Sequence, residues 1–161
     1  MIVVADTSVI LNLCRIQHEY LLQQLFQRVL IPAEVAGEFA RLTKIQKRFS
    51  GLVLPDWIEI LPAPKSFPTE VIEAQLDIGE SAAIALCLSQ KANVLLIDEK
   101  IGREVAARLG IRIVGIAGVL VGAKNEKLIS SVKVILNRLD AEANFWISWD
   151  LRLQVLQLAG E

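Results

Sequence analysis

Short apolar runs alternate along this chain with longer segments whose apolar residues recur at helical spacing. The short runs are rich in valine, leucine and isoleucine, which is typical of strands that are buried on both faces. Buried strands are predicted at residues 2–5, 29–31, 94–97 and 111–114, and a further short strand at 57–61 within a proline-rich stretch.

The segments between these runs predict helices. Apolar positions at helical spacing mark a helix over residues 9–26, and Pro32 opens a second, as proline often does in a first turn. Further helices are predicted at residues 69–75, 77–89 and 99–109, the last ended by Gly110, and from 117 to the end with breaks near Ser130 and Asp140.

Strands that alternate with helices predict an α/β protein, a three-layer α/β/α sandwich with a central, mainly parallel sheet. A single domain over residues 1–161 is expected, since no repeat or low-complexity tract divides the chain. The longest stretch without a charge, 113–123, is shorter than the roughly 20 residues of a membrane span. The N-terminus has no basic region before its apolar run, so we expect a soluble, cytoplasmic protein.

Composition excludes several kinds of chemistry. The net charge of −1 provides no global basic field, so contact with nucleic acid requires a local basic cluster or a metal ion. His18 is the only histidine and is expected at the surface, which excludes a histidine-rich zinc site. Cys14 and Cys87 lie far apart in apolar contexts and are predicted to be buried and reduced.

Two of the predicted strands end in aspartate. Asp6 follows the first strand and Asp98 follows the strand at 94–97. The carboxyl ends of parallel strands are where ligands bind in sheets of this class, so both side chains are candidates for function. Each also has a structural alternative, because Asp6 could form an Asx turn and Asp98 could cap the next helix.

Two glutamates add to this set. Glu38 lies at the edge of an apolar helical face, and Glu80 follows a glycine and precedes small residues that would let a ligand approach. Asp77 and Glu80 also fit a capping box, with Asp77 as the cap. For Glu38 the alternatives are an ion pair with Arg41 or Arg103, or simple solvation.

Four carboxylates at one sheet edge would repel each other unless a cation neutralised them. Mg²⁺ and Mn²⁺ prefer oxygen ligands, and sites of this kind support phosphoryl transfer by activating water and stabilising the leaving oxygen. The chain lacks a P-loop, which argues against nucleoside triphosphate hydrolysis.

Four sequence elements that carry these acids resemble the PIN-domain nucleases. They are DTS after the first strand, IPAEVAGEF, LDIGESAAIALC and LLIDEKIGREVA. The leucine-aspartate-x-glycine-glutamate element is similar to the VapC-like branch, and the C-terminal FWISWDLRLQVLQLAGE resembles the tail of that branch. The resemblance therefore covers nearly the whole chain and implies a PIN-like fold.

The resemblance also implies a site and an activity. It implies a Mg²⁺ or Mn²⁺ centre made by Asp6, Glu38, Glu80 and Asp98, in which Thr7 or Ser8 helps to hold the metal or its water. The implied activity is endonucleolytic hydrolysis of RNA by the toxin of a toxin–antitoxin pair. The implied partners are the RNA substrate, a small antitoxin protein and a second copy of the chain.

The chain departs from the family pattern at two places. Many relatives have aspartate at the third acidic position, and here we choose Glu80 because Asp77 is better explained as the helix cap. Many relatives also have a second aspartate shortly after the fourth acid. Here Glu99 follows Asp98 directly, and its side chain is expected to point away from Asp98.

Basic and aromatic residues provide candidate RNA contacts. A basic cluster after the Glu38 helix is either an RNA-binding patch or a solvated helix end, and consists of Arg41, Lys44, Lys47 and Arg48. Arg103 could hold Glu38 or Glu80 in place or bind the scissile phosphate. Trp57, Trp146 and Trp149 could stack on bases, although packing or an interface is favoured.

Three other functions compete with the ribonuclease hypothesis. A phosphatase of the haloacid-dehalogenase type would need a second aspartate two residues after Asp6, where this chain has Ser8. A structure-specific DNA nuclease usually needs extra helical modules, for which the chain has little room. A PIN fold that acts only as a binding or scaffold module stays open. Residues 113–123 and 145–147 are candidate interfaces or core segments.

Overall fold

Each short apolar run of the sequence forms a strand, and the segments between them form the helices. The computed structural model describes residues 1–161. In chain order its elements are β1 (Ile2–Ala5), α1 (Thr7–Arg15), α2 (Tyr20–Leu25), β2 (Arg28–Pro32), α3 (Ala33–Ile45), the 3₁₀ turn η1 (Lys47–Phe49), β3 (Glu59–Leu61), α4 (Thr69–Ala74), α5 (Ile78–Ser89), β4 (Val94–Leu96), α6 (Lys100–Arg108), β5 (Ile113–Val114), α7 (Ile116–Asn125), α8 (Val132–Ala143) and α9 (Trp149–Leu158).

The strands form one sheet in the order β3-β2-β1-β4-β5, and every neighbouring pair is parallel. The register pairs Ala5 at the end of β1 with Leu96 at the end of β4. The chain that leaves each of these two strands therefore emerges at the same edge of the sheet. The prediction of a parallel α/β sheet is confirmed.

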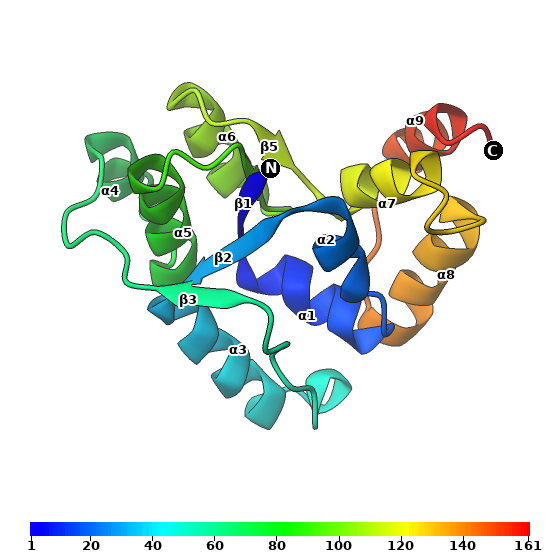
Figure 1. Cartoon of the computed structure of the whole chain (residues 1–161), viewed down its shortest axis with the longest axis horizontal. Helices are drawn as coiled ribbons and strands as arrows, with labels where there is room; N and C mark the ends of the chain where they lie inside the picture. The colour runs from blue at the N-terminus through cyan, green and yellow to red at the C-terminus, as the bar shows by residue number, and fades with distance from the viewer.

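Helices cover both faces of the sheet (Figure 1). The helix α5 packs across β1, β2 and β4 with α4 and α6 beside it, while α1, α2 and α7 lie on the other side. This division follows from right-handed crossovers, because the connections from β1 to β2 and from β3 to β4 cross the sheet in opposite directions. The predicted three-layer arrangement is confirmed, and the helices α7, α8 and α9 gather at one end of the molecule.

A single hydrophobic cluster of 41 buried residues fills the space between the layers. Strand β1 lies at its centre, where Val3, Val4 and Ala5 are fully buried. A central parallel strand has no solvent-exposed face, which explains why its sequence is continuously apolar instead of alternating.

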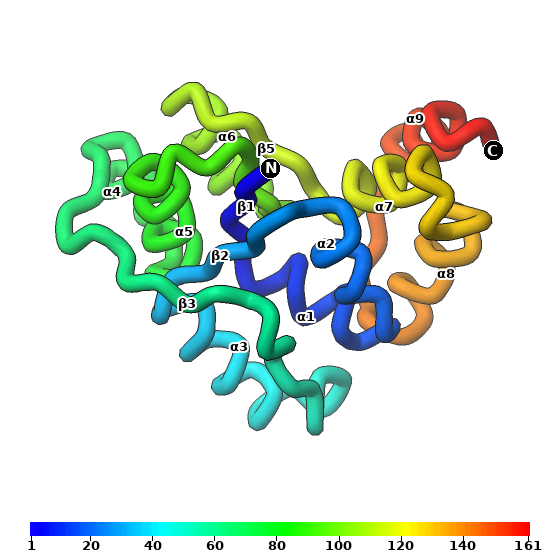
Figure 2. The backbone as a smooth tube through the Cα atoms, in the orientation of Figure 1, coloured from blue at the N-terminus to red at the C-terminus, as the bar shows by residue number.

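Two helix boundaries differ from the prediction. The predicted helix at 9–26 is two helices, α1 and α2, because Gln17 adopts a left-handed conformation with φ of 59° and turns the chain (Figure 2). The C-terminal break falls at Asn144, with φ of 53°, and not near Asp140, which lies inside α8. Asparagine tolerates this conformation better than most residues, so it is the natural end of that helix.

The two cysteines and the single histidine lie in buried or half-buried positions. Cys14 and Cys87 are both buried and unpaired, as expected. His18 is half-buried rather than fully exposed, and its Nδ1 lies 2.8 Å from the carbonyl oxygen of Ile16 in the turn between α1 and α2. No helix combines the length and the apolar character that crossing a membrane requires.

Candidate active site

An acidic cleft opens at the carboxyl edge of the sheet, with a volume of about 250 Å³. It receives side chains from the ends of β1 and β4 and from α1, α3, η1 and α5. Three of the four predicted acids line it, namely Asp6, Glu38 and Glu80, and the full lining comprises Asp6, Ser8, Leu11, Asn12, Glu38, Leu42, Gln46, Arg48, Phe49, Asp77, Glu80 and Glu99.

Asp6 is held at the floor of this cleft by the backbone. Its amide donates to the carbonyl oxygen of Leu96 at 2.9 Å, which extends the pairing of β1 with β4 by one residue. Asp6 is the N-cap of α1, but its side chain makes no capping hydrogen bond. The residue is only 5% exposed, and its side chain lines the cleft. The structure therefore does not use Asp6 as a helix cap.

Asp77 caps α5, as the sequence predicted, and Glu80 lies in the cleft. The Asp77 side chain caps α5 by accepting a hydrogen bond from the Glu80 amide at 2.8 Å. This bond fixes the first turn of α5 and leaves the Glu80 side chain, which is 7% exposed, directed to the cleft. Asp77 is exposed and also lines the cleft at its rim.

Gly79 brings the helices α3 and α5 close together beside the acids. A Cβ atom at this position would lie 2.4 Å from Oε2 of Glu38. The carboxylate of Glu38 therefore rests against the backbone of the residue that precedes Glu80. This close approach gives a physical reason for glycine in the Asp77–Glu80 turn.

Burial and mutual repulsion keep these carboxyl groups from ionising at their usual pH. Burial raises the pKa of Asp6 to about 7, with added repulsion from Glu38 and Asp77. Burial likewise raises the pKa of Glu80 to about 7, with repulsion from Asp77 and Asp6. The pKa of Glu38 is also raised, first by burial and then by Asp77.

No ion pair within the protein compensates this cluster. None of the four ion pairs in the structure involves Asp6, Glu38 or Glu80. The structural alternative for Glu38, an ion pair with Arg41 or Arg103, is therefore not formed, although Arg41 lies near enough to lower the pKa of Glu38 in part. In this structure no three of these side chains already stand in a metal-binding arrangement.

Asp98, the fourth predicted acid, does not line the cleft. Both of its carboxylate oxygens accept from the amide of Ile116 at 3.2 Å, at the start of α7. Burial raises its pKa to about 6, while the Ile116 hydrogen bond and Arg103 lower it. Asp98 does not cap α6, the helix that follows it. It accepts instead from the first turn of α7, which begins 18 residues later. Its neighbour Glu99, not Asp98, lines the cleft.

Arg103 lies beside Asp98 and is also held by the backbone. Its Nη1 donates to the carbonyl oxygen of Ile97 at 2.8 Å. It forms no ion pair with Glu38 or Glu80, so the suggested role of holding those side chains is not seen.

Gly115→Ala tests how tightly Asp98 and Arg103 pack against the start of α7. The new Cβ would lie 2.4 Å from Oδ1 of Asp98 and 3.0 Å from Nη1 of Arg103. We expect a loss of about 1–3 kcal/mol in the free energy of unfolding, because overpacking forces neighbours to move. Gly37→Ala is the matched control, since nothing lies within 4 Å of its Cβ and alanine favours a helix. Equal stability of the two variants in urea unfolding would contradict the packing described here.

Small polar residues complete the cleft. Ser8 lines it, whereas the hydroxyl of Thr7 is buried beside Glu38, whose pKa it lowers. Asn12 and Gln46 also line it and were missed by the sequence analysis. Asn12 lies four residues after Ser8 in α1, and residues four apart in a helix share a face. Helical spacing from the DTS element could therefore have identified it.

Only one member of the predicted basic cluster reaches the cleft. Arg48 lines it, with its guanidinium carbon 4.7 Å from the centre of the Phe49 ring. Lys44 and Lys47 are exposed and lie outside the lining. The cluster is therefore mainly a solvated helix end from which Arg48 turns inward.

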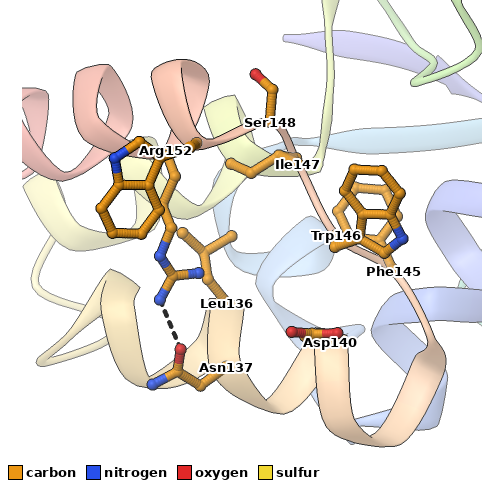
Figure 3. Close-up of a pocket in the computed structure, with 9 residues that line it drawn as sticks. Leu136, Asn137, Asp140, Phe145, Trp146, Ile147, Ser148 and Arg152 are labelled. Atoms are coloured by element: carbon orange, nitrogen blue, oxygen red, sulfur yellow. Dashed lines mark hydrogen bonds between the residues drawn. The ribbon is translucent and has the colours of Figure 1, made fainter.

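The aromatic tail forms a separate surface at the other end of the molecule. Trp146 and Trp149 are 70% and 69% exposed, whereas Trp57 packs against the core. A pocket of about 500 Å³ lies beside them, and Figure 3 shows Trp146 and Arg152 on opposite sides of it, with Arg152 bonded to Asn137. Of the two candidate interfaces, residues 145–147 expose Trp146 while Phe145 and Ile147 pack half-buried against the core, and residues 113–123 lie mostly in the core.

Comparisons with known proteins agree with this architecture. A family model for the PIN domain, DUF3368, matches residues 2–161. Among solved structures, the chain is similar to a PilT N-terminus domain protein, SSO1118, from the archaeon Sulfolobus solfataricus P2. The TM-score is 0.53 at 21% identity, over 74% of this chain and 90% of that one, which shows a shared fold. No curated protein matches in sequence. Since the family model spans nearly the whole chain, this protein belongs to the PIN-domain family, whose members are typically nucleases that use divalent metal ions.

Proposed function

We propose that this PIN domain is a metal-dependent endoribonuclease. The observation that carries the proposal is a pair of acidic residues, Asp6 and Glu80, that are each less than 10% exposed and line a cleft in which neither forms an ion pair. Burying charges without compensation is costly, so a fold that retains them has a use for them.

The donor set fits a hard divalent cation. Asp6, Glu38 and Glu80 offer only oxygen atoms, as Mg²⁺ and Mn²⁺ prefer, and no histidine or cysteine lines the cleft. These three side chains would hold the ion, with the hydroxyl of Thr7 beside Glu38 and that of Ser8 in the cleft lining. When bound, such an ion neutralises the acids and makes water more acidic.

The chain's own residues would then direct the hydrolysis of RNA. The cleft carboxylates orient a water molecule for in-line attack on phosphorus and accept its proton. The new bond joins the water oxygen to phosphorus while the bond from phosphorus to the 3′-oxygen breaks. The products carry 5′-phosphate and 3′-hydroxyl ends.

Arg48 is the residue best placed to contact the substrate phosphate. It is the only cationic side chain that lines the cleft, and its planar guanidinium suits a phosphate oxygen pair. It is exposed and forms no ion pair, so its charge is free to bind.

Arg48→Ala should raise KM for RNA roughly fivefold to twentyfold, because one charge-assisted phosphate contact is lost. Its neighbour Lys47 lies outside the cleft, so Lys47→Ala is the control and should change KM less than about twofold. Steady-state cleavage at two salt concentrations measures both. Equal effects of the two substitutions would show that Arg48 acts only through bulk charge.

The direct test of the activity is cleavage of a labelled single-stranded RNA, and of DNA of the same sequence, with Mg²⁺, with Mn²⁺ and with EDTA. We expect RNA to be cut only with a metal ion and to yield 5′-phosphate ends. Metal-dependent cleavage of DNA alone would make the protein a DNA nuclease. Metal binding without cleavage of a broad RNA pool, tRNA included, would favour a scaffold module.

We further propose that this ribonuclease is the toxin of a toxin–antitoxin pair and that it acts as a homodimer. The support is the resemblance of its motifs to the VapC-like branch together with the exposed aromatic tail, which suits a protein interface. Induced expression in a bacterial host should arrest growth for the parent and not for Asp6→Asn. A small open reading frame beside the gene should encode a protein that restores growth.

A further inference from the structure

Asp98 and Glu99 are adjacent in sequence, but their side chains line different pockets of the surface. Asp98 lies in the groove beside α7, which Arg103 and Gly115 also line, and Glu99 lies in the acidic cleft. Side chains of consecutive residues in extended backbone point to opposite sides, and Glu99 has φ of −66° and ψ of 128°. The local backbone thus separates the two carboxylates.

Asp98 is held by the backbone where it lies. Both oxygens share the Ile116 amide, at the positive end of the α7 helix dipole. Oδ1 also rests so close to the backbone of Gly115 that no Cβ fits between them. A carboxylate held in this way joins the end of β4 to the start of α7. Although it contributes repulsion to Asp6, both of its oxygens accept from the protein backbone.

The carboxylate of Glu99, unlike that of Asp98, has no partner within the protein. Its carboxylate forms no ion pair and its side chain makes no capping hydrogen bond to α6. It lines the same cleft as Asp6, Glu38 and Glu80, and it lies near enough to Glu80 to repel it. The two buried carboxylates without a cationic partner, Asp6 and Glu80, mark this cleft as the place where a cation is needed.

We propose that Glu99, and not Asp98, supplies the fourth carboxylate of the metal site, and that Asp98 is a positioning residue which anchors the β4–α6 turn to α7. The proposal rests on the proposed metal-dependent function. It assigns to the glutamate the role that the family resemblance gives to the aspartate before it. Asp98 acts on the metal only through the placement of Glu99.

Calorimetric titration of Mn²⁺ into the metal-free full chain separates the two residues. Glu99→Gln should raise the Kd for Mn²⁺ about tenfold, since it removes one anionic oxygen ligand. Glu104→Gln is the matched control, because it removes the same charge from an exposed residue of α6 outside the cleft, and should change Kd less than about twofold.

Asp98 is tested with a conservative pair. Asp98→Asn keeps an oxygen that accepts from the Ile116 amide, so Mn²⁺ affinity should stay within about threefold of the parent. Asp98→Ala loses that anchor and should weaken Mn²⁺ binding as well as lower Tm. Restoration of affinity in the asparagine variant is the signature of positioning, because a metal ligand would not tolerate loss of its charge.

The outcomes distinguish this inference from the function on which it rests. A parent protein that binds no Mn²⁺ would reject the metal-dependent function itself. If the parent binds Mn²⁺, two results would overturn only the assignment of Glu99. One is an unchanged Kd in Glu99→Gln, and the other is a Kd in Asp98→Asn as high as that in Glu99→Gln. Normal Mn²⁺ binding by Asp98→Ala would remove the positioning role of Asp98.

Discussion

Asp6→Asn is expected to abolish RNA cleavage and at the same time to stabilise the metal-free fold. The variant removes a carboxylate oxygen from the floor of the cleft, and loss of a direct metal contact should lower kcat/KM at least about 100-fold. Its stability should rise, because the protein no longer has to keep a buried charge without a partner.

The gain should grow as the pH rises above about 4, be complete above about pH 7, where the parent's Asp6 is ionised, and vanish below about pH 4. Burial raises the pKa of Asp6 from 3.8 to about 7, so its ionised form destabilises the fold. A gain of about 2 kcal/mol corresponds to roughly 4–8 °C in Tm for a chain of this length. Asp56→Asn, at an exposed position away from the cleft, should change neither activity nor Tm. A less stable Asp6→Asn variant in EDTA would contradict the account.

Metal-free protein should lose stability as pH rises from about 5 to about 8, the reverse of the usual trend for carboxylates. Asp6 and Glu80 have pKa values of about 7 in the fold, against 3.8 and 4.5 as ordinary values. The folded state therefore binds more protons than the unfolded state in this window, and stability falls as pH rises through the folded pKa. Thermal melts in EDTA across this range measure the slope.

The double variant Asp6→Asn/Glu80→Gln should flatten this slope. Glu161 provides a control of opposite sign, because hydrogen bonds from Ser131 and from the Val132 and Lys133 amides lower its pKa to about 2 in spite of some burial. Its contribution is complete above pH 4.5 and is lost only in acid, so Glu161→Gln should leave the slope between pH 5 and 8 unchanged. A stability that rises through neutral pH in EDTA would contradict the raised pKa values.

Much of this fold and site follows from local sequence. The continuous apolar runs at Ile2–Ala5 and Val94–Leu96 indicate buried parallel strands, and the sheet then brings their ends to one edge. The Asp77 cap and the inward Glu80 follow from the capping-box spacing, which is decided within one helical turn. Features that depend on neighbours along the chain were predictable in this sense.

Features that depend on distant contacts were not. Asp98 faces away from the cleft because it accepts a hydrogen bond from Ile116, 18 residues later, and no local pattern at the end of β4 encodes that partner. Gln17 breaks the helix predicted at 9–26 with a positive φ that glutamine rarely adopts, so tertiary packing of α2 overrides local propensity. Arg48, likewise, is separated from the other basic residues only by the turn that η1 makes toward Phe49.

The most direct test of the central claim is the binding of Mn²⁺ to the acidic cleft, measured by titration calorimetry with the metal-free parent, Asp6→Asn and Asp56→Asn. The account predicts saturable binding by the parent and Asp56→Asn, and its loss in Asp6→Asn. Absence of binding to the parent, or binding that Asp6→Asn retains in full, would show that the buried carboxylates of this PIN domain are not a metal site.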